Sequence, residues 1–279
     1  MGDAMAIGLD GVRLFHRTSG TGAPIVLVHG SWGDHHDWDV VAPALSERHT
    51  VIVYDRRGHG LSVAQRPATV HDHVADLCAL VEALGRGPVH LVAHSYGASI
   101  ALRAAALHPH LFRSLAAHEP PLVRLLDQGG PLGPALRAFG DAYARIEPLL
   151  RSGRMSDAAQ TFVDEVGIGP GTWDRLGRAA RDSFVRAAPT FLAEIEDPDA
   201  LDLDLSTLRA FRGPVLLSQG DRSPPLFVPV LDRIATALPQ ATRHTFVRAG
   251  HVPQVSHPRA YVKRVLAFVA AAGADASRR

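Results

Sequence analysis

Short apolar runs alternate along this chain with stretches in which apolar residues recur at helical spacing. The runs predict strands at Val12–Arg17, Ile25–Val28, Val51–Tyr54, Val89–Ala93, Ser114–His118, Val215–Ser218 and Thr242–Val247. The amphipathic stretches predict helices near residues 71–84, 96–108, 225–237 and 258–271. Continuous apolar runs are typical of parallel strands that are buried on both faces. The alternation therefore predicts an α/β fold with a mostly parallel central sheet flanked by helices.

The alternation stops in the middle of the chain, between residues 121 and 207. Glycine and proline interrupt this segment at Gly129–Pro131, Gly153, Gly167–Gly171 and Pro189, with helix-like pieces between them and no convincing strand. An insertion at this point lies over the carboxyl ends of the strands, where open α/β sheets bind ligands. We therefore expect a helical lid, or cap, at residues 121–207 on a core made of residues 1–120 and 208–279.

Composition excludes several classes of partner. The 279 residues carry 29 Lys and Arg against 28 Asp and Glu, so there is no basic field for nucleic acid. No apolar run approaches the roughly 18 residues of a membrane span, and residues 1–5 lack the basic start of a secretory leader. We expect a cytoplasmic protein with neither nucleic acid nor membrane as partner, and we leave formation of a homodimer open.

The sequence around Ser95 predicts a nucleophile. Ala93-His-Ser-Tyr-Gly-Ala98 follows a predicted buried strand and opens a predicted helix. In such a turn the flanking positions must be small, here Ala93, Gly97 and Ala98, and the serine hydroxyl is exposed above the sheet. The first N–H groups of the helix then favour negative charge beside it. We therefore expect Ser95 to be a catalytic serine.

The loop after the first buried parallel strand is predicted to pack against the Ser95 turn. The apolar run at residues 24–28 is followed by His29-Gly-Ser-Trp-Gly33, a glycine-bearing turn that brings a backbone N–H close to the expected nucleophile. We expect the backbone N–H groups of Ser31 and Tyr96 to form a two-donor oxyanion hole.

A serine nucleophile needs a base, and position selects one of the 16 histidines. His251 follows the last predicted strand and precedes the final helix, which fits the chain order in which the histidine of a hydrolase triad comes last. The side chain of His94 leaves the Ser95 turn in another direction, so we interpret it as part of a pocket wall or of the packing. His257 is interpreted as the entry to the final helix. We expect His251 to be the catalytic base.

Together these motifs resemble the α/β-hydrolase superfamily: His29–Gly33, Asp55–Ser62, Ala93–Ala98 and Gly250-His251. Within it, the chain resembles the zearalenone-lactonase-like group of serine hydrolases, through His118–Pro121, Gly220–Pro225 and the stretch from His251 to Pro258. The resemblance implies an α/β-hydrolase fold and catalysis by a serine, a histidine and an acid.

The acid departs from the commonest pattern of that superfamily. Many members place an aspartate three residues after the glycine that ends the next-to-last strand, and counting from Gly220 this slot holds Ser223. Asp221 lies on the same loop, although it is also a suitable turn residue. Glu119 ends the preceding predicted strand, where members such as the lactonase-like group carry their acid. We expect Glu119 to complete the triad, with Asp221 as the alternative.

These residues predict a serine esterase or lactonase that cleaves a small-molecule ester or lactone. The lid aromatics Trp173 and Phe191, together with Trp32, are expected to bind a mainly apolar substrate, unless the lid residues only form its own core. Phe191 also matches a ligand-facing aromatic in lactonase-like relatives. We expect no cofactor and no metal, since no His, Cys and Asp cluster has the spacing of a closed metal site. The same triad also supports cofactor-free cleavage of a carbon–carbon bond, perhydrolysis or, without turnover, a receptor role.

Overall fold

The computed structural model describes residues 3–9 and 12–276, and among these residues the centre is a nine-stranded sheet. The strands are β1 (Asp3–Leu9), β2 (Val12–Ser19), β3 (Pro24–Val28), β4 (Thr50–Tyr54), β5 (Val63–Ala64), β6 (Val89–His94), β7 (Phe112–His118), β8 (Val215–Gly220) and β9 (Ala241–Phe246). Their order is β1-β2-β4-β3-β6-β7-β8-β9, with β5 paired to β2. All pairs from β4 to β9 are parallel, whereas β2 is antiparallel to β1, β4 and β5. The predicted, mostly parallel sheet is confirmed.

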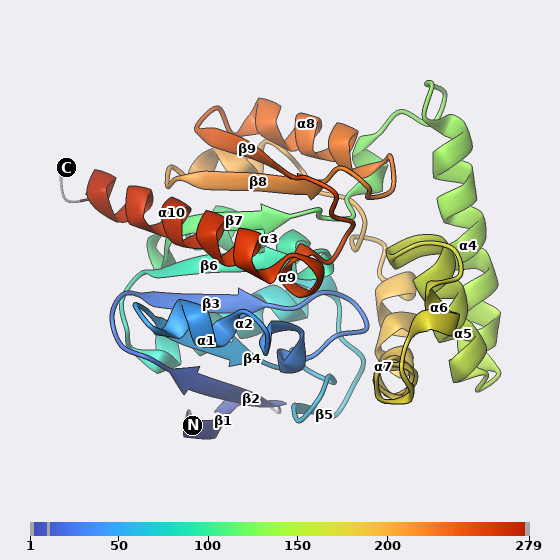
Figure 1. Ribbon diagram of the computed structural model, residues 1–279, viewed down its shortest axis with the longest axis horizontal. Coiled ribbons are helices and arrows are strands. Elements are labelled where there is room, and N and C mark those ends of the chain that lie inside the picture. The colour runs from blue at the N-terminus through green and yellow to red at the C-terminus, as the bar shows by residue number, and fades with distance from the viewer. Residues whose placement is uncertain (1–2, 10–11, 277–279) are drawn as a thin grey trace.

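Helices cover both faces of this sheet (Figure 1). Helices α2 (Val70–Leu84), α3 (Tyr96–Leu107) and α8 (Phe227–Ala237) pack on one face, and α1 (Ala42–Ser46) and α10 (Pro258–Ala276) pack on the other. A short helix, α9 (Pro253–Ser256), precedes α10. The four predicted helices correspond to α2, α3, α8 and α10.

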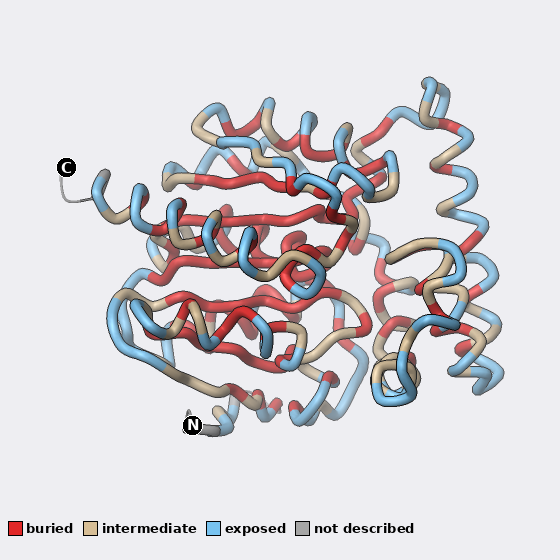
Figure 2. The backbone as a smooth tube through the Cα atoms, viewed as in Figure 1, coloured by how far each residue is buried: buried red, intermediate tan, exposed pale blue. Residues whose placement is uncertain are grey.

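The burial of the central strands explains their uninterrupted apolar sequence. In β3, Val26 and Val28 belong to the cluster under α2 and α3, whereas Ile25 and Leu27 belong to the cluster under α1 and α10. Successive side chains of a strand point to opposite faces, so a strand covered on both sides needs apolar residues at every position. Figure 2 shows the central strands as buried along their length.

Between β7 and β8 the chain forms four α-helices and no strand, in a segment that the structure describes completely. They are α4 (Gly133–Arg151), α5 (Met155–Phe162), α6 (Thr172–Arg175) and α7 (Arg178–Glu196). Figure 1 shows them gathered beyond the carboxyl ends of the parallel strands. Pro189 lies inside α7 and does not end it, contrary to its interpretation as a helix breaker. The buried neighbours Ala188 and Phe191 hold the helix there despite the hydrogen bond that proline cannot donate.

Residues 1–2, part of the N-terminal stretch for which we expect no leader, lie outside the described residues. None of the helices in the described part of the chain combines the length and apolar character needed to cross a bilayer.

Candidate active site

The turn between β6 and α3 holds Ser95 in an uncommon backbone conformation. Its φ is 54° and its ψ is −125°. A non-glycine residue keeps such a conformation only where the surrounding structure enforces it. The Ser95 N–H donates to the carbonyl of His118 at 2.8 Å, and the Ser95 carbonyl accepts from the Ala98 N–H at 2.8 Å. The strained turn is thus fixed to β7 on one side and to α3 on the other.

Two glycines allow the loop after β3 to pack against this turn. A Cβ on Gly97 would lie 2.4 Å from the carbonyl oxygen of His29, and a Cβ on Gly30 would lie 3.0 Å from the Cβ of Ser95. No larger side chain fits either space without displacing the loop. The segment that carries Ser31 therefore lies against the turn between β6 and α3, as the oxyanion-hole prediction requires.

His251, in the loop between β9 and α9, is held by a carboxylate. Its Nδ1 lies 2.5 Å from Oε2 of Glu119, so a proton on Nδ1 is donated to Glu119 and Nε2 is left as the basic atom. The imidazole also stacks on Phe227, with ring centroids 4.8 Å apart and 10° between the planes. Both the tautomer and the ring orientation of His251 are therefore determined by its neighbours.

Glu119 is itself fixed at the end of β7. It is fully buried and has a φ of 46°, and its Oε1 accepts a hydrogen bond from the Gly220 N–H at 2.7 Å. Burial acts to raise the pKa of Glu119, but His118 and the hydrogen bond with His251 outweigh it and lower the pKa below its usual value. Glu119 is consequently held as the carboxylate.

The alternative acid lies elsewhere. Asp221 is exposed, and its carboxylate has no hydrogen bond or ion pair within the described part of the chain. Ser223, in the slot that usually holds the acid, has a buried hydroxyl oxygen and contributes to the lowered pKa of Glu119. The structure brings Glu119 to His251 and leaves Asp221 in solvent.

Ser95 and His251 line the same small cavity, whose volume is about 80 Å³. Its walls come from both the core and the segment between β7 and β8. The apolar lining residues are Trp32, Phe162, Ile168, Phe184, Val252 and Val255. A reacting group in this cavity is surrounded mainly by apolar surface.

The three aromatic residues predicted to bind substrate have different positions. Trp32 lines the cavity and contacts Phe162 and Phe191, with ring centroids 4.9 Å and 5.0 Å apart. Phe191 and Trp173 are buried in the apolar cluster of the helical segment and are not among the residues that line the cavity. The structure thus brings Trp32 to the cavity that Ser95 lines and places the other two aromatics in the packing of the helical segment.

Three further histidines near the turn serve the structure. His94 also lines the cavity, and its Nε2 donates to the carbonyl of His251 at 2.8 Å. His29 bonds the Gly30 carbonyl through Nδ1 at 2.9 Å. Burial lowers the pKa of His29 to about 3 and that of His118 to about 4. These buried rings are neutral near pH 7.

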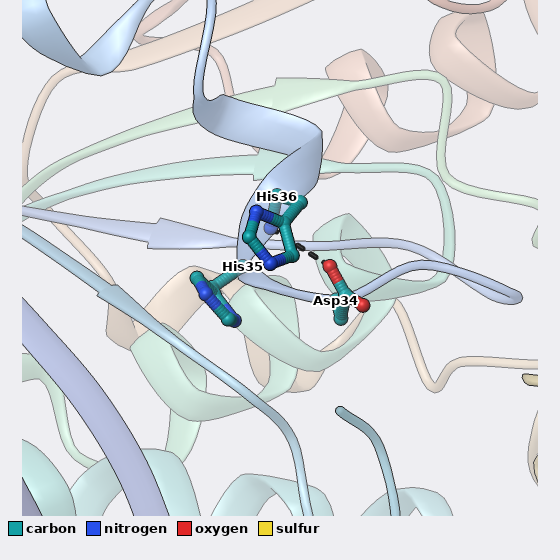
Figure 3. A group of neighbouring side chains, drawn as sticks. All are labelled: Asp34, His35 and His36. Atoms are coloured by element: carbon teal, nitrogen blue, oxygen red, sulfur yellow. Dashed lines mark hydrogen bonds between the residues drawn. The ribbon is translucent and has the colours of Figure 1, made fainter. Parts of the chain in front are cut away.

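Two groups of side chains among the described residues are close enough together to hold a metal ion. One is His118, Glu119 and His251, which belongs to the site above. The other is Asp34, His35 and His36, shown in Figure 3. In that group Asp34 accepts from the His36 N–H at 2.8 Å, and the Nδ1 atoms of His35 and His36 bond Asp55 and Asp39. These bonds explain the cluster as the start of a short 3₁₀ helix (His35–Trp38).

The sequence reasoning missed Asp37, which lines the same cavity as Ser95 and His251. Its carboxylate lies against Gly33, where a Cβ would be 2.0 Å from Oδ2, and it has no hydrogen-bond partner among the residues that the structure describes. Burial, with Asp34 adding to it, raises the pKa of Asp37 to about 7. No local signal marked this residue, because its neighbours suggest only a helix start.

Asp37→Asn is expected to stabilise the protein at high pH. Since the pKa of Asp37 is higher in the folded than in the unfolded state, its contribution to stability is complete below about pH 4 and is lost as the pH rises to about 7. The variant should gain about 1–2 kcal/mol of unfolding free energy at roughly pH 8, because partial exposure screens part of the full shift. Urea titrations of both proteins at roughly pH 4 and 8 measure this difference, and a constant difference would contradict it.

A buried ion pair was also missed. Arg56, in the turn after β4, lies 3.0 Å from Glu194 of α7, and both side chains are almost completely buried. The two residues are 138 positions apart in the sequence, so no local pattern could pair them.

Comparison with known proteins places this arrangement in a family. A sequence model of the alpha/beta hydrolase family matches residues 25–264. The chain therefore belongs to the alpha/beta hydrolase family, which its fold confirms.

Individual relatives cover most of the chain. It is 32% identical over 263 residues to a pimeloyl-(acyl-carrier protein) methyl ester esterase of Chromobacterium violaceum, covering 90% of this chain and 96% of that one. It is 29% identical over 273 residues to a 2-hydroxy-6-oxo-2,4-heptadienoate hydrolase of Pseudomonas putida, covering 90% and 91%. A solved alpha/beta hydrolase from Sphaerobacter thermophilus matches with a TM-score of 0.78 and 26% identity, covering 95% and 100%. The relatives support a hydrolase.

Proposed function

We propose that this protein is a serine hydrolase that cleaves a carboxylic ester or lactone of a mainly apolar small molecule through an acyl-enzyme. The observation that carries the proposal is the 2.5 Å contact between Glu119 and His251, together with the position of His251 in the same apolar cavity as Ser95. The esterase of Chromobacterium violaceum, which acts on a methyl ester by name, supports the same reaction class.

In the proposed mechanism His251 removes the proton of Ser95 through Nε2 as Oγ attacks the acyl carbonyl. Glu119 keeps the proton of Nδ1 in place and balances the positive charge that appears on the ring. The N–H groups of Ser31 and Tyr96 stabilise the oxyanion. Collapse expels the alcohol, which His251 protonates, and water activated by His251 then hydrolyses the acyl-enzyme. For a lactone the alcohol stays attached, so the product is one hydroxy acid.

We further propose that residues 121–207 act as a lid over this site. The support is that Phe162, Ile168 and Phe184, all from this segment, complete the wall of the cavity around Ser95. The closer resemblance to the zearalenone-lactonase-like group favours lactones and stays a prediction.

A fluorophosphonate probe tests the proposal because it labels an activated serine whatever the substrate. We expect labelling of Ser95 in the wild-type protein, located by mass spectrometry of its peptides, together with turnover on a panel of esters and lactones. Absence of both would overturn the proposed hydrolase, and tight ligand binding without turnover would favour a receptor.

Carbon–carbon bond hydrolysis is the second candidate. The relative from Pseudomonas putida is named for 2-hydroxy-6-oxo-2,4-heptadienoate, a substrate without an ester group, and it matches nine tenths of both chains. Including a vinylogous diketone in the panel separates the two reactions, because only a carbon–carbon hydrolase cleaves it faster than a matched ester.

Phe184→Ala and Phe191→Ala are expected to have different effects. Phe184 lines the cavity, so its truncation should lower kcat/KM for bulky apolar esters by about tenfold relative to acetyl esters. Phe191 is 1% exposed in the lid cluster, so its truncation should reduce the free energy of unfolding by about 3–5 kcal/mol. Kinetics on a series of esters of increasing acyl length and urea denaturation of both variants check this. A lower kcat/KM for bulky esters alone in Phe191→Ala would show that Phe191 contacts the substrate.

A further inference from the structure

Glu194 connects the helical segment to the loop that carries Ser31. It lies near the end of α7 and is 4% exposed. Its Oε2 accepts a hydrogen bond from the Ser31 hydroxyl at 2.5 Å, and its Oε1 accepts from the Arg56 guanidinium at 3.0 Å. A single carboxylate therefore fixes one expected oxyanion residue directly.

Arg56 extends this contact to the rest of the expected oxyanion hole. The nitrogen that bonds Glu194 also donates to the carbonyl of Gly30 at 2.9 Å, one residue before Ser31. The guanidinium lies over the ring of Tyr96, 5.1 Å from its centroid, which is a favourable cation–π geometry. Both residues whose N–H groups are expected to bind the oxyanion thus contact the ion pair.

Burial makes this pair an unusual feature of the molecule. Desolvation raises the pKa of Glu194 against the opposing effect of Arg56. Taking two charges out of water is costly, and apolar residues of similar volume often give equal or greater stability. By contrast, Glu196 on the same helix pairs with Arg151 in solvent. A role in geometry explains the buried pair better than a role in stability.

We propose that Glu194 is a positioning residue that places the Ser31 and Tyr96 N–H groups for the oxyanion, so that a helix of the proposed lid completes the catalytic geometry. The proposal rests on the proposed hydrolase function. Oxyanion donors act only when they lie about 2.7–3.1 Å from the developing charge. Loss of Glu194 should therefore lower kcat rather than raise KM.

The first test compares three variants with p-nitrophenyl butyrate as substrate. Glu194→Ala should lower kcat by about 30- to 100-fold with KM within about threefold, close to the loss of one oxyanion donor. Glu194→Gln, which keeps an acceptor for the Ser31 hydroxyl, should recover most of this loss. Glu196→Ala is the matched control on the exposed side of α7 and should retain wild-type kinetics.

A double-mutant cycle shows whether Glu194 acts through Ser31. Ser31→Ala removes the hydroxyl and keeps the backbone N–H, so the double variant with Glu194→Ala should be no slower than Glu194→Ala alone, within about threefold. The inhibition constant of a phenylboronic acid, whose adduct with Ser95 mimics the tetrahedral intermediate, should rise in parallel with the fall in kcat.

Each outcome decides a different claim. A lower melting temperature with unchanged kcat in Glu194→Ala would make Glu194 a structural residue and overturn the inference. If that variant does not fold, Ser31→Ala decides instead: a lower kcat at unchanged melting temperature supports the inference, and an unchanged kcat overturns it. A wild-type protein that neither reacts with fluorophosphonate nor hydrolyses any ester or lactone overturns the proposed function and this inference with it.

Discussion

Ser95→Ala is expected to abolish turnover while the protein stays folded. The smaller side chain fits the turn, whose steric demands fall on Gly97 and Gly30, and the hydroxyl of Ser95 makes no hydrogen bond within the described residues that folding would lose. Removal of a triad serine in another hydrolase costs on the order of a million-fold in kcat. A loss of this size is expected here because Ser95 forms the covalent intermediate in the proposed mechanism.

Single-turnover kinetics on a reactive p-nitrophenyl ester measure the loss, with circular dichroism as the check on folding. Ser256→Ala is a suitable control, because Ser256 is exposed and, within the described residues, its hydroxyl bonds only the Val252 carbonyl and His257. Retention of more than a few per cent of the wild-type rate by a pure Ser95→Ala preparation would remove Ser95 from the mechanism.

The fold was predictable where burial of an element leaves a regular pattern of apolar residues in the sequence. β3 and β4 are covered on both faces, so all their residues except Thr50 are apolar and the strand signal is continuous. The sequence pattern did not predict β1. Among the described strands, β1 lies at the edge of the sheet and pairs only with β2, and an edge strand does not need a continuous apolar run. β5 has two residues, too few for any periodicity.

The candidate triad was predictable because turn geometry constrains its sequence. Small residues must flank Ser95, and His251 follows the last strand as chain order requires. The resemblance to known hydrolases, rather than any periodicity, pointed to Glu119. Contacts between distant segments leave no such local mark: Ser31 and Glu194 are 163 positions apart, and only the folded chain brings them together.

The proposed lid shows the same limit. A helical pattern in α7 identifies an apolar face, but it does not say whether that face covers the substrate or the lid's own core. Phe184 and Phe191 lie seven positions apart on the same helix, so spacing alone treats them alike. Only Phe184 reaches the cavity.

Glu119→Gln is expected to lower kcat by several orders of magnitude. The amide keeps the volume and the contact with the Gly220 N–H, but it removes the charge that stabilises the His251 imidazolium and permits the wrong tautomer of the ring. The corresponding change in a serine protease, a standard worked case, costs about ten-thousand-fold in kcat. The 2.5 Å contact with His251 and the complete burial of Glu119 place this residue to have a similar effect.

Asp221→Asn is the matched control, since Asp221 is the rival acid on the neighbouring loop and its carboxylate is exposed. It should change kcat by less than about threefold, as surface substitutions have small effects. A large loss in Asp221→Asn with a mild one in Glu119→Gln would make Asp221 the acid, and would remove the main support for a lactonase-like enzyme while Ser95 and His251 kept their roles.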